Sequence, residues 1–259
     1  EQLSKENANV HLLRLLEIKQ AEKILDIACG QGFFSREMAR AGGEVIEVDI
    51  SRELIEMARQ STGDLRSNLG QSKVRPSPSK SNPTFVVSPA HELPFLASLS
   101  MDKATAILVL QNIENYQEVL KEAARVLKPG GALYIVLSHP AFRVPKGSEW
   151  GWDPSTLLGT SQPGVQYRRV DRYLSELKVP IDMHPASGSD IQTVTFHRSL
   201  QLYFKAFHRA GFQVSRLEEW ISHKKSGPGP RAKAEDWARK EFPLFLALEA
   251  TKYRKSVFV

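Results

Sequence analysis

The sequence has almost no cysteine: Cys29 is the only one among 259 residues. A single thiol excludes a disulfide within the chain and any zinc site built from several cysteines. We interpret Cys29, which lies in a glycine-containing turn, as a small side chain that fills the turn rather than as a nucleophile. No run of about 18 apolar residues occurs, so the sequence predicts no membrane-spanning helix.

Two phosphate-binding motifs are also missing. A complete Gly-x-Gly-x-x-Gly motif starting at Gly30 would need glycine at position 35, but Ser35 stands there. The sequence contains no Gly-Lys-Ser or Gly-Lys-Thr either. The first motif accompanies binding of a dinucleotide pyrophosphate and the second grips a triphosphate. These absences argue against NAD, FAD and ATP as ligands of the glycine turn.

What is present is an apolar run with one acid, Asp26, that leads directly into a turn of small residues. This order is typical of a buried parallel strand that feeds a ligand-binding loop in an open α/β sheet. Gly30 and Gly32 let a ligand approach the backbone closely and permit positive φ angles. The next strand-like run, residues 44–49, ends in Asp49, whose carboxylate could accept both hydroxyls of a ribose. A nucleoside without phosphates fits this pattern best.

Residues 26–32 resemble the first motif of class I S-adenosylmethionine-dependent methyltransferases, with Ala28 where that family usually has glycine. Three further blocks resemble the family's later motifs and follow in the family's order, over about half of the chain: Val48-Asp49-Ile50-Ser51, Ala90-His91-Glu92-Leu93-Pro94-Phe95 and Arg125-Val126-Leu127-Lys128-Pro129-Gly130-Gly131. The similarity is closest to the small-molecule, quinone-biosynthesis-like branch (methyltransferase type 11). It implies S-adenosylmethionine as cofactor and S-adenosylhomocysteine as its product.

The resemblance also implies which residues bind the cofactor. They are Asp26, Ala28, Cys29, Gly30, Gly32, Asp49, Ile50, Ala90, His91, Leu110 and Gln111. One position departs from the family, since Pro89 stands where an acid often binds the adenine amino group. Adenine recognition is therefore expected from backbone groups of Ala90 and His91.

The expected fold class is α/β, a Rossmann-like, seven-stranded, doubly wound sheet with six parallel strands, one antiparallel strand and a substrate lid inserted after the fifth strand. Periodicity and turn residues predict strands at 23–28, 44–49, 84–87, 103–110, 132–138, 212–218 and 243–251. They predict helices at 33–41, after Ser51, at 115–127 and at 200–210, and an N-terminal helix with a leucine stripe that could close over the ligand site. The predicted parts are a cofactor-binding core at 1–138 with a flexible insertion at 61–83, a lid at 139–198 and a segment at 199–259 that completes the sheet.

Four residues are candidates for the chemistry: His139, His197, Tyr167 and Gln111. A histidine could act as base toward a hydroxyl acceptor, and the family often places a group that faces the methyl where Gln111 lies. In the lid, runs 167–174 and 193–197 read as paired strands that direct Tyr167, Arg168 and His197 toward the methyl. The alternative for each residue is a purely structural role. His184 and His208 are interpreted as bystanders.

Two further features of the sequence, a group of aromatic residues and a basic C-terminal segment, do not decide the chemical class of the methyl acceptor. Trp150, Trp152 and Tyr167 could line a pocket for a planar or cationic acceptor, or could pack against one another. The net charge is +6, and nine Lys/Arg residues against four acids lie in 221–259. This surface could attract nucleic acid or an anion, or be merely solvated.

The sequence favours a small-molecule acceptor. The alternatives are an RNA or protein methyltransferase that uses the basic C-terminal surface, and a cofactor-binding module without turnover. No pair of His and acid residues shows ligand spacing, so no metal is predicted. No signal peptide is visible, which favours a cytoplasmic protein. Because the sequence starts at Glu1 rather than Met, an organellar protein with a trimmed leader stays an alternative. The acceptor atom (O, N, C or S) and the oligomeric state stay open.

Overall fold

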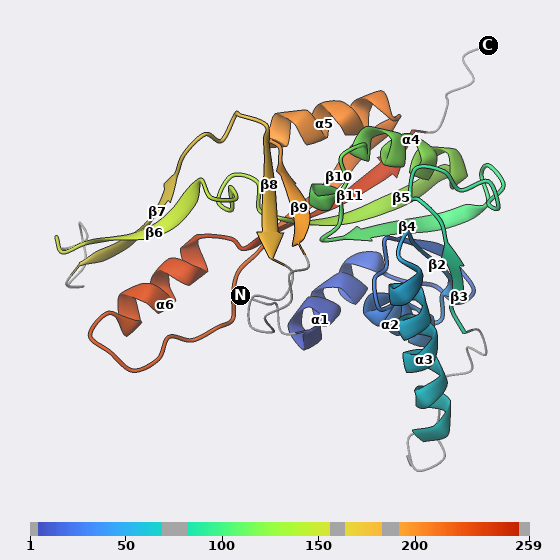
Figure 1. The fold of residues 1–259 in the computed structure, drawn as a ribbon, viewed down its shortest axis with the longest axis horizontal. Coiled ribbons are helices and arrows are strands. Elements are labelled where there is room, and N and C mark those ends of the chain that lie inside the picture. Colours follow the sequence, from blue (N-terminus) through green and yellow to red (C-terminus); the bar gives the residue numbers. More distant parts are fainter. Residues whose placement is uncertain (1–4, 69–81, 156–163, 183–191, 254–259) are drawn as a thin grey trace.

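The computed structural model describes residues 5–68, 82–155, 164–182 and 192–253, and its centre is a seven-stranded sheet (Figure 1). The strand order is β10-β11-β5-β4-β1-β2-β3. The strands are β1 (Lys23–Ile27), β2 (Glu44–Asp49), β3 (Thr84–Val87), β4 (Met101–Ile107), β5 (Leu127–Ser138), β10 (Phe212–Trp220) and β11 (Phe245–Lys252). Only β11 runs antiparallel to its neighbours in this sheet, so the predicted Rossmann-like fold with six parallel strands and one antiparallel strand is confirmed.

Helices cover both faces of the sheet (Figure 1). Those on the sheet are α1 (Lys5–Leu16), α2 (Phe33–Arg40), α3 (Arg52–Asn68), α4 (Tyr116–Val126) and α5 (Leu200–Arg209). The helix α6 (Ala232–Glu241) lies outside the sheet, and the 3-10 turn η2 (Leu110–Asn112) follows β4. Alternate residues of a strand face opposite sides, and β1 follows this rule. Leu25 belongs to the core cluster beneath α4 and α5, whereas Ile24 belongs to the cluster with α1 and α2.

The N-terminal helix is part of this core. In α1, Leu12, Leu15 and Leu16 are buried together with Met38 of α2 and Trp220 of β10. The predicted helix is therefore present, and its leucine stripe packs on the sheet. No helix within the described ranges has both the length and the apolar character needed to cross a bilayer.

The insertion predicted at 61–83 begins later than expected. Residues 61–68 continue α3, and the hydroxyl of Thr62 donates to the carbonyl of Ala58 at 2.9 Å. A threonine that bonds to the preceding helical turn satisfies its own polar group and can remain inside a helix. The prediction was thus wrong for 61–68, and residues 69–81 of the predicted insertion lie outside the described residues.

The segment after β5 contains two antiparallel pairs, β6 (Ser148–Asp153) with β7 (Val165–Val170) and β8 (Leu177–Asp182) with β9 (Gln192–His197). The predicted runs do form strands, but they do not pair with each other as expected, because β7 pairs with β6 and β9 pairs with β8. The β6–β7 pair extends away from the sheet with α6 beside it, while β8–β9 lies against the body (Figure 1). His184 lies outside the described residues.

Candidate active site

The loop between β1 and α2 carries three residues in the left-handed region. Ala28 has φ 53°, Gly30 has φ 58° and Gly32 has φ 67°. A β-carbon added at Gly30 would meet no atom within 4 Å, whereas one at Gly32 would lie 2.5 Å from Glu47 Oε2. Gly30 therefore faces open space and Gly32 faces the protein interior. This is the arrangement expected of a loop that a ligand approaches from one side.

Asp26 lies beneath this loop. Its carboxylate accepts hydrogen bonds from the Ser35 hydroxyl and from Thr105 Oγ1, the latter at 2.6 Å. Burial raises the pKa of Asp26 to about 6, and the two hydroxyl bonds oppose that rise. Ser35, at the position where a dinucleotide motif would have glycine, thus ties α2 to the end of β1. A direct cofactor contact of Asp26 stays a prediction, because the carboxylate is buried and these internal bonds engage it.

Glu47 is the neighbour of Asp26 across the β1–β2 pair and is fully buried. Neither of its carboxyl oxygens has a hydrogen-bond partner in the part of the chain that the structure describes. Burial, and then the charge of Asp26, raise the pKa of Glu47 to about 8. At neutral pH this carboxyl therefore carries a proton. The contact of Ser35 with Asp26 and the burial of Glu47 were not predicted from the sequence.

Cys29 lies in the same loop and is half-buried. Its backbone N–H donates to the carbonyl of Val48 at 3.0 Å, which joins the loop to the end of β2. Burial raises the pKa of its thiol well above the usual range. Since the thiolate is the reactive form, these surroundings agree with the interpretation of Cys29 as a filler of the turn.

Asp49 ends β2 beside the loop. Its two oxygens accept the N–H groups of Gly30 and Ser51, each at 2.9 Å. A carboxylate has about four acceptor sites, so Asp49 can still accept bonds from a ligand's hydroxyls. The next residue, Ile50, is apolar and 75% exposed. Open space at Gly30, spare acceptor capacity at Asp49 and an exposed apolar side chain together fit the adenosine part of the predicted cofactor.

The other predicted cofactor residues lie on the loops after β3 and β4. Ala90 is half-buried and His91 is exposed, in a turn where Glu92 N–H donates to the Pro89 carbonyl at 3.1 Å. Leu110 is fully buried in η2. Gln111 donates through Nε2 to the Leu108 carbonyl at 2.9 Å, and its buried Oε1 lacks a partner among the described residues.

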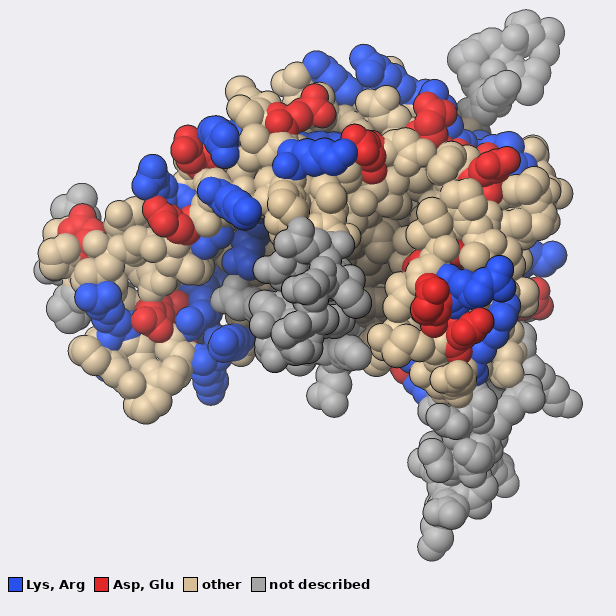
Figure 2. Space-filling view, in the orientation of Figure 1, with Lys and Arg blue, Asp and Glu red and all other residues tan. Residues whose placement is uncertain are grey.

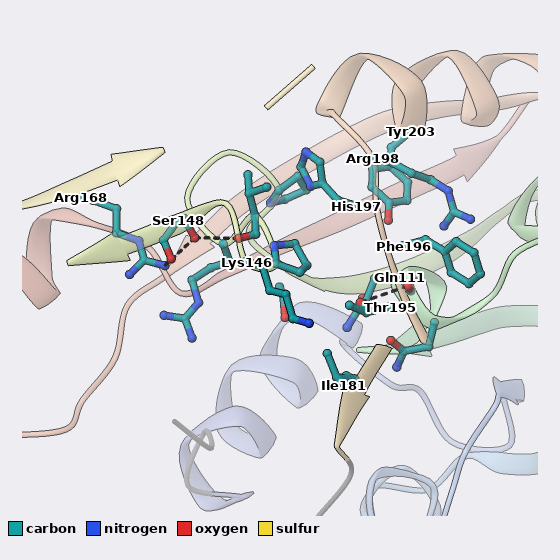
Figure 3. Close-up of a pocket in the computed structure, with 16 residues that line it drawn as sticks. Gln111, Lys146, Ser148, Arg168, Ile181, Thr195, Phe196, His197, Arg198 and Tyr203 are labelled. Atoms are coloured by element: carbon teal, nitrogen blue, oxygen red, sulfur yellow. Dashed lines mark hydrogen bonds between the residues drawn. The ribbon is translucent and has the colours of Figure 1, made fainter. Parts of the chain in front are cut away.

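A cavity of about 510 Å³ adjoins Gln111 (Figure 3). Gln111, Asn112, Ser138, Pro140, Arg143, Val144, Pro145, Lys146, Ser148, Arg168, Ile181, Thr195, Phe196, His197, Arg198 and Tyr203 line it. Of the four predicted catalytic residues, Gln111 and His197 belong to this wall. His139 and Tyr167 do not belong to it. Arg168, which the sequence placed with them, does line the cavity.

His197 has one ring nitrogen engaged. Its Nε2 lies 2.8 Å from the carbonyl of Tyr173, and a carbonyl can only accept, so Nε2 carries the hydrogen. The neutral ring then presents an unprotonated Nδ1. Burial lowers the pKa of His197, which favours this neutral form at physiological pH.

His139 differs, because both of its ring nitrogens are engaged. Ala141 N–H donates to Nδ1 at 3.2 Å, which leaves Nε2 to donate to Glu219 Oε1 at 2.8 Å. The residue is buried, and its carbonyl accepts the N–H groups of Phe142 and Arg143 in the turn that follows β5. These contacts give His139 a role in the turn and bring no free nitrogen to the cavity.

The predicted aromatic pocket is not assembled. Tyr167 is 45% exposed and lies across the β6–β7 pair against Gly151. The guanidinium of Arg168 lies 5.1 Å from the ring of Trp150, and that of Arg231 lies 4.7 Å from the ring of Trp152. The tryptophans thus support arginines, and none of these three aromatic residues lines the cavity.

Arg198 is a residue that the sequence analysis missed. It is buried and donates to the carbonyls of Leu110, Ile113 and Glu114 at 2.8–3.1 Å. Its guanidinium also lies 4.1 Å from the ring of Tyr116. Arg198 therefore fixes the end of β9 to the turn that carries Gln111. A lone arginine after a strand gives no sequence signal for such a contact.

Comparison with known proteins adds to this geometry. Residues 25–135 match the family described as "Methyltransferase domain". This part of the chain thus resembles a methyltransferase domain. Demethylmenaquinone methyltransferase of Tropheryma whipplei is 32% identical to it over 128 residues, which are 49% of this chain and 46% of that enzyme. The matched part thus spans less than half the length of that relative.

Two further comparisons extend beyond the matched domain. The ubiquinone/menaquinone biosynthesis C-methyltransferase UbiE of Haemophilus ducreyi is 32% identical over 190 residues, covering 71% of this chain and 66% of that enzyme. An S-adenosylmethionine dependent methyltransferase from Mesorhizobium loti, 22% identical, aligns with a TM-score of 0.65 over 96% of this chain and all of that one. The family resemblance is confirmed, and the fold is shared with a solved S-adenosylmethionine dependent methyltransferase.

Proposed function

We propose that this protein transfers the methyl group of S-adenosylmethionine to a small-molecule acceptor bound in the cavity beside Gln111. The observation that carries the proposal is the position of Gln111. It follows β4, where the family places a group near the methyl, and it also lies in the wall of a cavity of about 510 Å³. Cavities of roughly 300–1,000 Å³ are typical of small-molecule sites. Relatives named for quinone biosynthesis support this substrate size.

The cofactor would be held by the loop at residues 28–32, by Asp49 and by Ile50. Asp49 would accept the ribose hydroxyls, Gly30 would allow close approach, and Ile50 would cover the adenine. Backbone groups of Ala90 and His91 would bind the adenine edge in place of the missing acid at Pro89. When bound, the cofactor supplies a methyl group already activated on a sulfonium.

With the methyl activated, the remaining work of the protein is alignment. The acceptor atom must lie in line with the bond that breaks, and such positioning is worth roughly 7–11 kcal/mol. Arg198 contributes by fixing the turn of Gln111 to β9, so that two walls of the cavity keep one geometry. The buried acceptor oxygen of Gln111 is available to orient a donor group of the substrate.

For a hydroxyl acceptor, His197 is the base. Its Nδ1 would take the proton of the hydroxyl as the oxygen attacks, and the hydrogen bond from Nε2 to the Tyr173 carbonyl would stabilise the charged ring. His139 is not assigned this role, because both of its nitrogens are engaged. For an acceptor that needs no deprotonation, His197 would only shape the cavity.

The proposal is tested by following the labelled methyl group of S-adenosylmethionine to its acceptor. The protein is incubated with methyl-labelled S-adenosylmethionine and a cell extract separated into small molecules, RNA and protein. The proposal predicts label in the small-molecule fraction. Label in RNA or protein instead would support the alternative use of the basic surface, and that transfer should weaken steeply with salt. Binding of cofactor without transfer to any fraction would indicate a module without turnover.

A further inference from the structure

We infer that the acceptor carries an anionic group, a carboxylate or a phosphate, which Arg143, Lys146 and Arg168 bind at one end of the cavity. This inference rests on the function proposed above, because it concerns the substrate of the same site. It departs from the planar or cationic acceptor that the sequence suggested. Three kinds of observation support it: the charge of the wall, the way Arg168 and Lys146 are placed, and the separation of the two ends.

The charge of the wall has one sign. Arg143, Lys146, Arg168 and Arg198 line the cavity, and no aspartate or glutamate is among the described residues that line it. Cations gathered in a concave site repel one another and create a positive potential that attracts anions. In Figure 2, Lys and Arg side chains gather between the outer β6–β7 pair and the body of the molecule. A cationic acceptor would be opposed by this field.

Arg168 is held in place by hydrogen bonds to a backbone carbonyl and a hydroxyl group, among other contacts. Its Nε donates to the carbonyl of Phe142 at 2.9 Å, and Nη2 donates to the hydroxyl of Ser148 at 2.7 Å. Trp150 lies beneath the guanidinium. These contacts fix the plane of the group. A fixed planar guanidinium is suited to bind a carboxylate or phosphate.

Lys146 is placed by a strained turn. Its φ is 55°, a conformation that is uncommon for a residue other than glycine and that occurs preferentially at functional sites. The turn is held because Gly147 N–H donates to the Val144 carbonyl at 3.0 Å and Asp171 N–H donates to the Gly147 carbonyl at 2.7 Å. Within the described part of the chain, the ammonium of Lys146 forms no ion pair and no hydrogen bond.

Two cationic side chains just outside the cavity, unlike Lys146, form ion pairs with acidic residues. Arg169 is the next residue along β7, and its Nη1 pairs with Glu149 at 3.1 Å. Lys178 of β8 pairs with Glu114 at 3.1 Å. The outer cations thus have acidic partners on neighbouring elements, whereas the wall of the cavity offers Lys146 none among the described residues. An anion from solution would supply that partner.

The two ends of the cavity are separated. In Figure 3, Lys146, Ser148 and Arg168 lie at one end, and Gln111, Thr195 and His197 lie at the other. The anionic group would therefore anchor the substrate while a second group of the same molecule meets the methyl. The substrate would be bifunctional, with its anion remote from the acceptor atom.

The test uses the full chain saturated with S-adenosylhomocysteine, whose binding is measured first by calorimetry. Phenyl phosphate, benzoate and the neutral benzyl alcohol are then titrated at low salt by ligand-observed NMR. The variants are Arg143→Gln and Lys146→Gln, with Arg169→Gln as the matched control, and thermal unfolding checks that each is folded. The titrations are repeated without S-adenosylhomocysteine.

One or both anions should bind, and benzyl alcohol should bind at least about tenfold more weakly, as expected for loss of a charge-assisted contact. Arg143→Gln and Lys146→Gln should each weaken anion binding by about tenfold, while Arg169→Gln should not. The tighter anion identifies the group as carboxylate or phosphate. Equal binding of benzyl alcohol, or equal losses in all three variants, would overturn the inference. If S-adenosylhomocysteine failed to bind, the proposed function would fail, whereas normal binding without anion preference would defeat the inference alone.

Discussion

Gly32 lies directly over the carboxyl group of Glu47, so that a β-carbon at position 32 would come within 2.5 Å of Glu47 Oε2. The same added atom would lie 3.2 Å from the β-carbon of Ala58. Gly30, two residues earlier, has no atom within 4 Å of its own added β-carbon. The two glycines of one short motif are thus required for different reasons, one by packing and one by the ligand.

This difference predicts that two substitutions act mainly on different properties, one on stability and one on ligand affinity. Gly32→Ala should lower the free energy of unfolding by about 2–5 kcal/mol, because the methyl group is forced against Glu47 and the left-handed backbone at φ 67° is also strained. Gly30→Ala should cost only the strain of its left-handed backbone, about 1–2 kcal/mol, but should lose most of the affinity for S-adenosylhomocysteine. Urea unfolding and calorimetry measure the two quantities. Wild-type affinity in Gly30→Ala would contradict the assignment.

Ala28 offers a test of backbone strain in the same loop. Its φ of 53° costs an alanine about 1–2 kcal/mol of steric strain, and a glycine at this position would avoid that strain. Part of that gain is offset because glycine has more freedom in the unfolded chain, by roughly 0.4–1 kcal/mol. Ala28→Gly should therefore raise the free energy of unfolding by up to about 1.6 kcal/mol, and Ala28→Val should lower it. Urea unfolding of both variants checks this, and a destabilised Ala28→Gly would show that the methyl group contributes packing.

The buried carboxyl of Glu47 predicts a pH dependence. Its pKa rises from 4.5 to about 8, so the folded state holds a proton that the unfolded state releases between these values. Stability from this group is present below pH 4.5 and is lost as the pH rises through 8. Glu47→Gln should match wild type near pH 5 and be more stable by at least about 1 kcal/mol near pH 9.

Urea unfolding at pH 5, 7 and 9 measures this effect. Glu44→Gln is the matched control, because Glu44 is exposed at the other end of β2. A stability difference between Glu47→Gln and wild type that stayed constant with pH would show that Glu47 does not titrate as its burial requires.

The assignment of His197 as base predicts that kcat/KM with a hydroxyl acceptor depends on pH. Burial lowers the pKa of His197 below 6.5, so the acidic limb of kcat/KM should inflect below that value. His197→Gln should lower kcat by about 10²–10⁴-fold and leave S-adenosylhomocysteine affinity intact. His208→Gln, at an exposed position on α5, serves as control. Unchanged kcat in His197→Gln would remove its role as base.

Strong local patterns made the core predictable. The bounds of β2 and β3 were predicted correctly, because each is a short run of strand-forming residues bounded by turn residues. β5 begins at Leu127, five residues earlier than predicted, because Pro129 and Gly130 signalled a turn. The structure accommodates them at an irregularity in the pairing of β4 with β5.

The inserted segment was harder to predict, because its order depends on contacts between distant residues. β8 contains Pro180, which argues against a central strand but is tolerated in a two-stranded pair. His139 directly follows a strand, a position that favoured a catalytic role, yet its role depends on Glu219, 80 residues away. Arg143 and Lys146 carried no motif, and only the folded chain brings them to Arg168.

The most direct test of the account is cofactor binding at Asp49. Calorimetry should show S-adenosylhomocysteine binding to wild type, and Asp49→Asn should weaken it by about 1.5–3 kcal/mol, roughly 10- to 150-fold. Glu44→Gln, on the same strand, should bind like wild type, and thermal unfolding should show that all three proteins are folded. Failure of the wild type to bind, or equal affinity in Asp49→Asn, would contradict the assignment of this loop as the cofactor site.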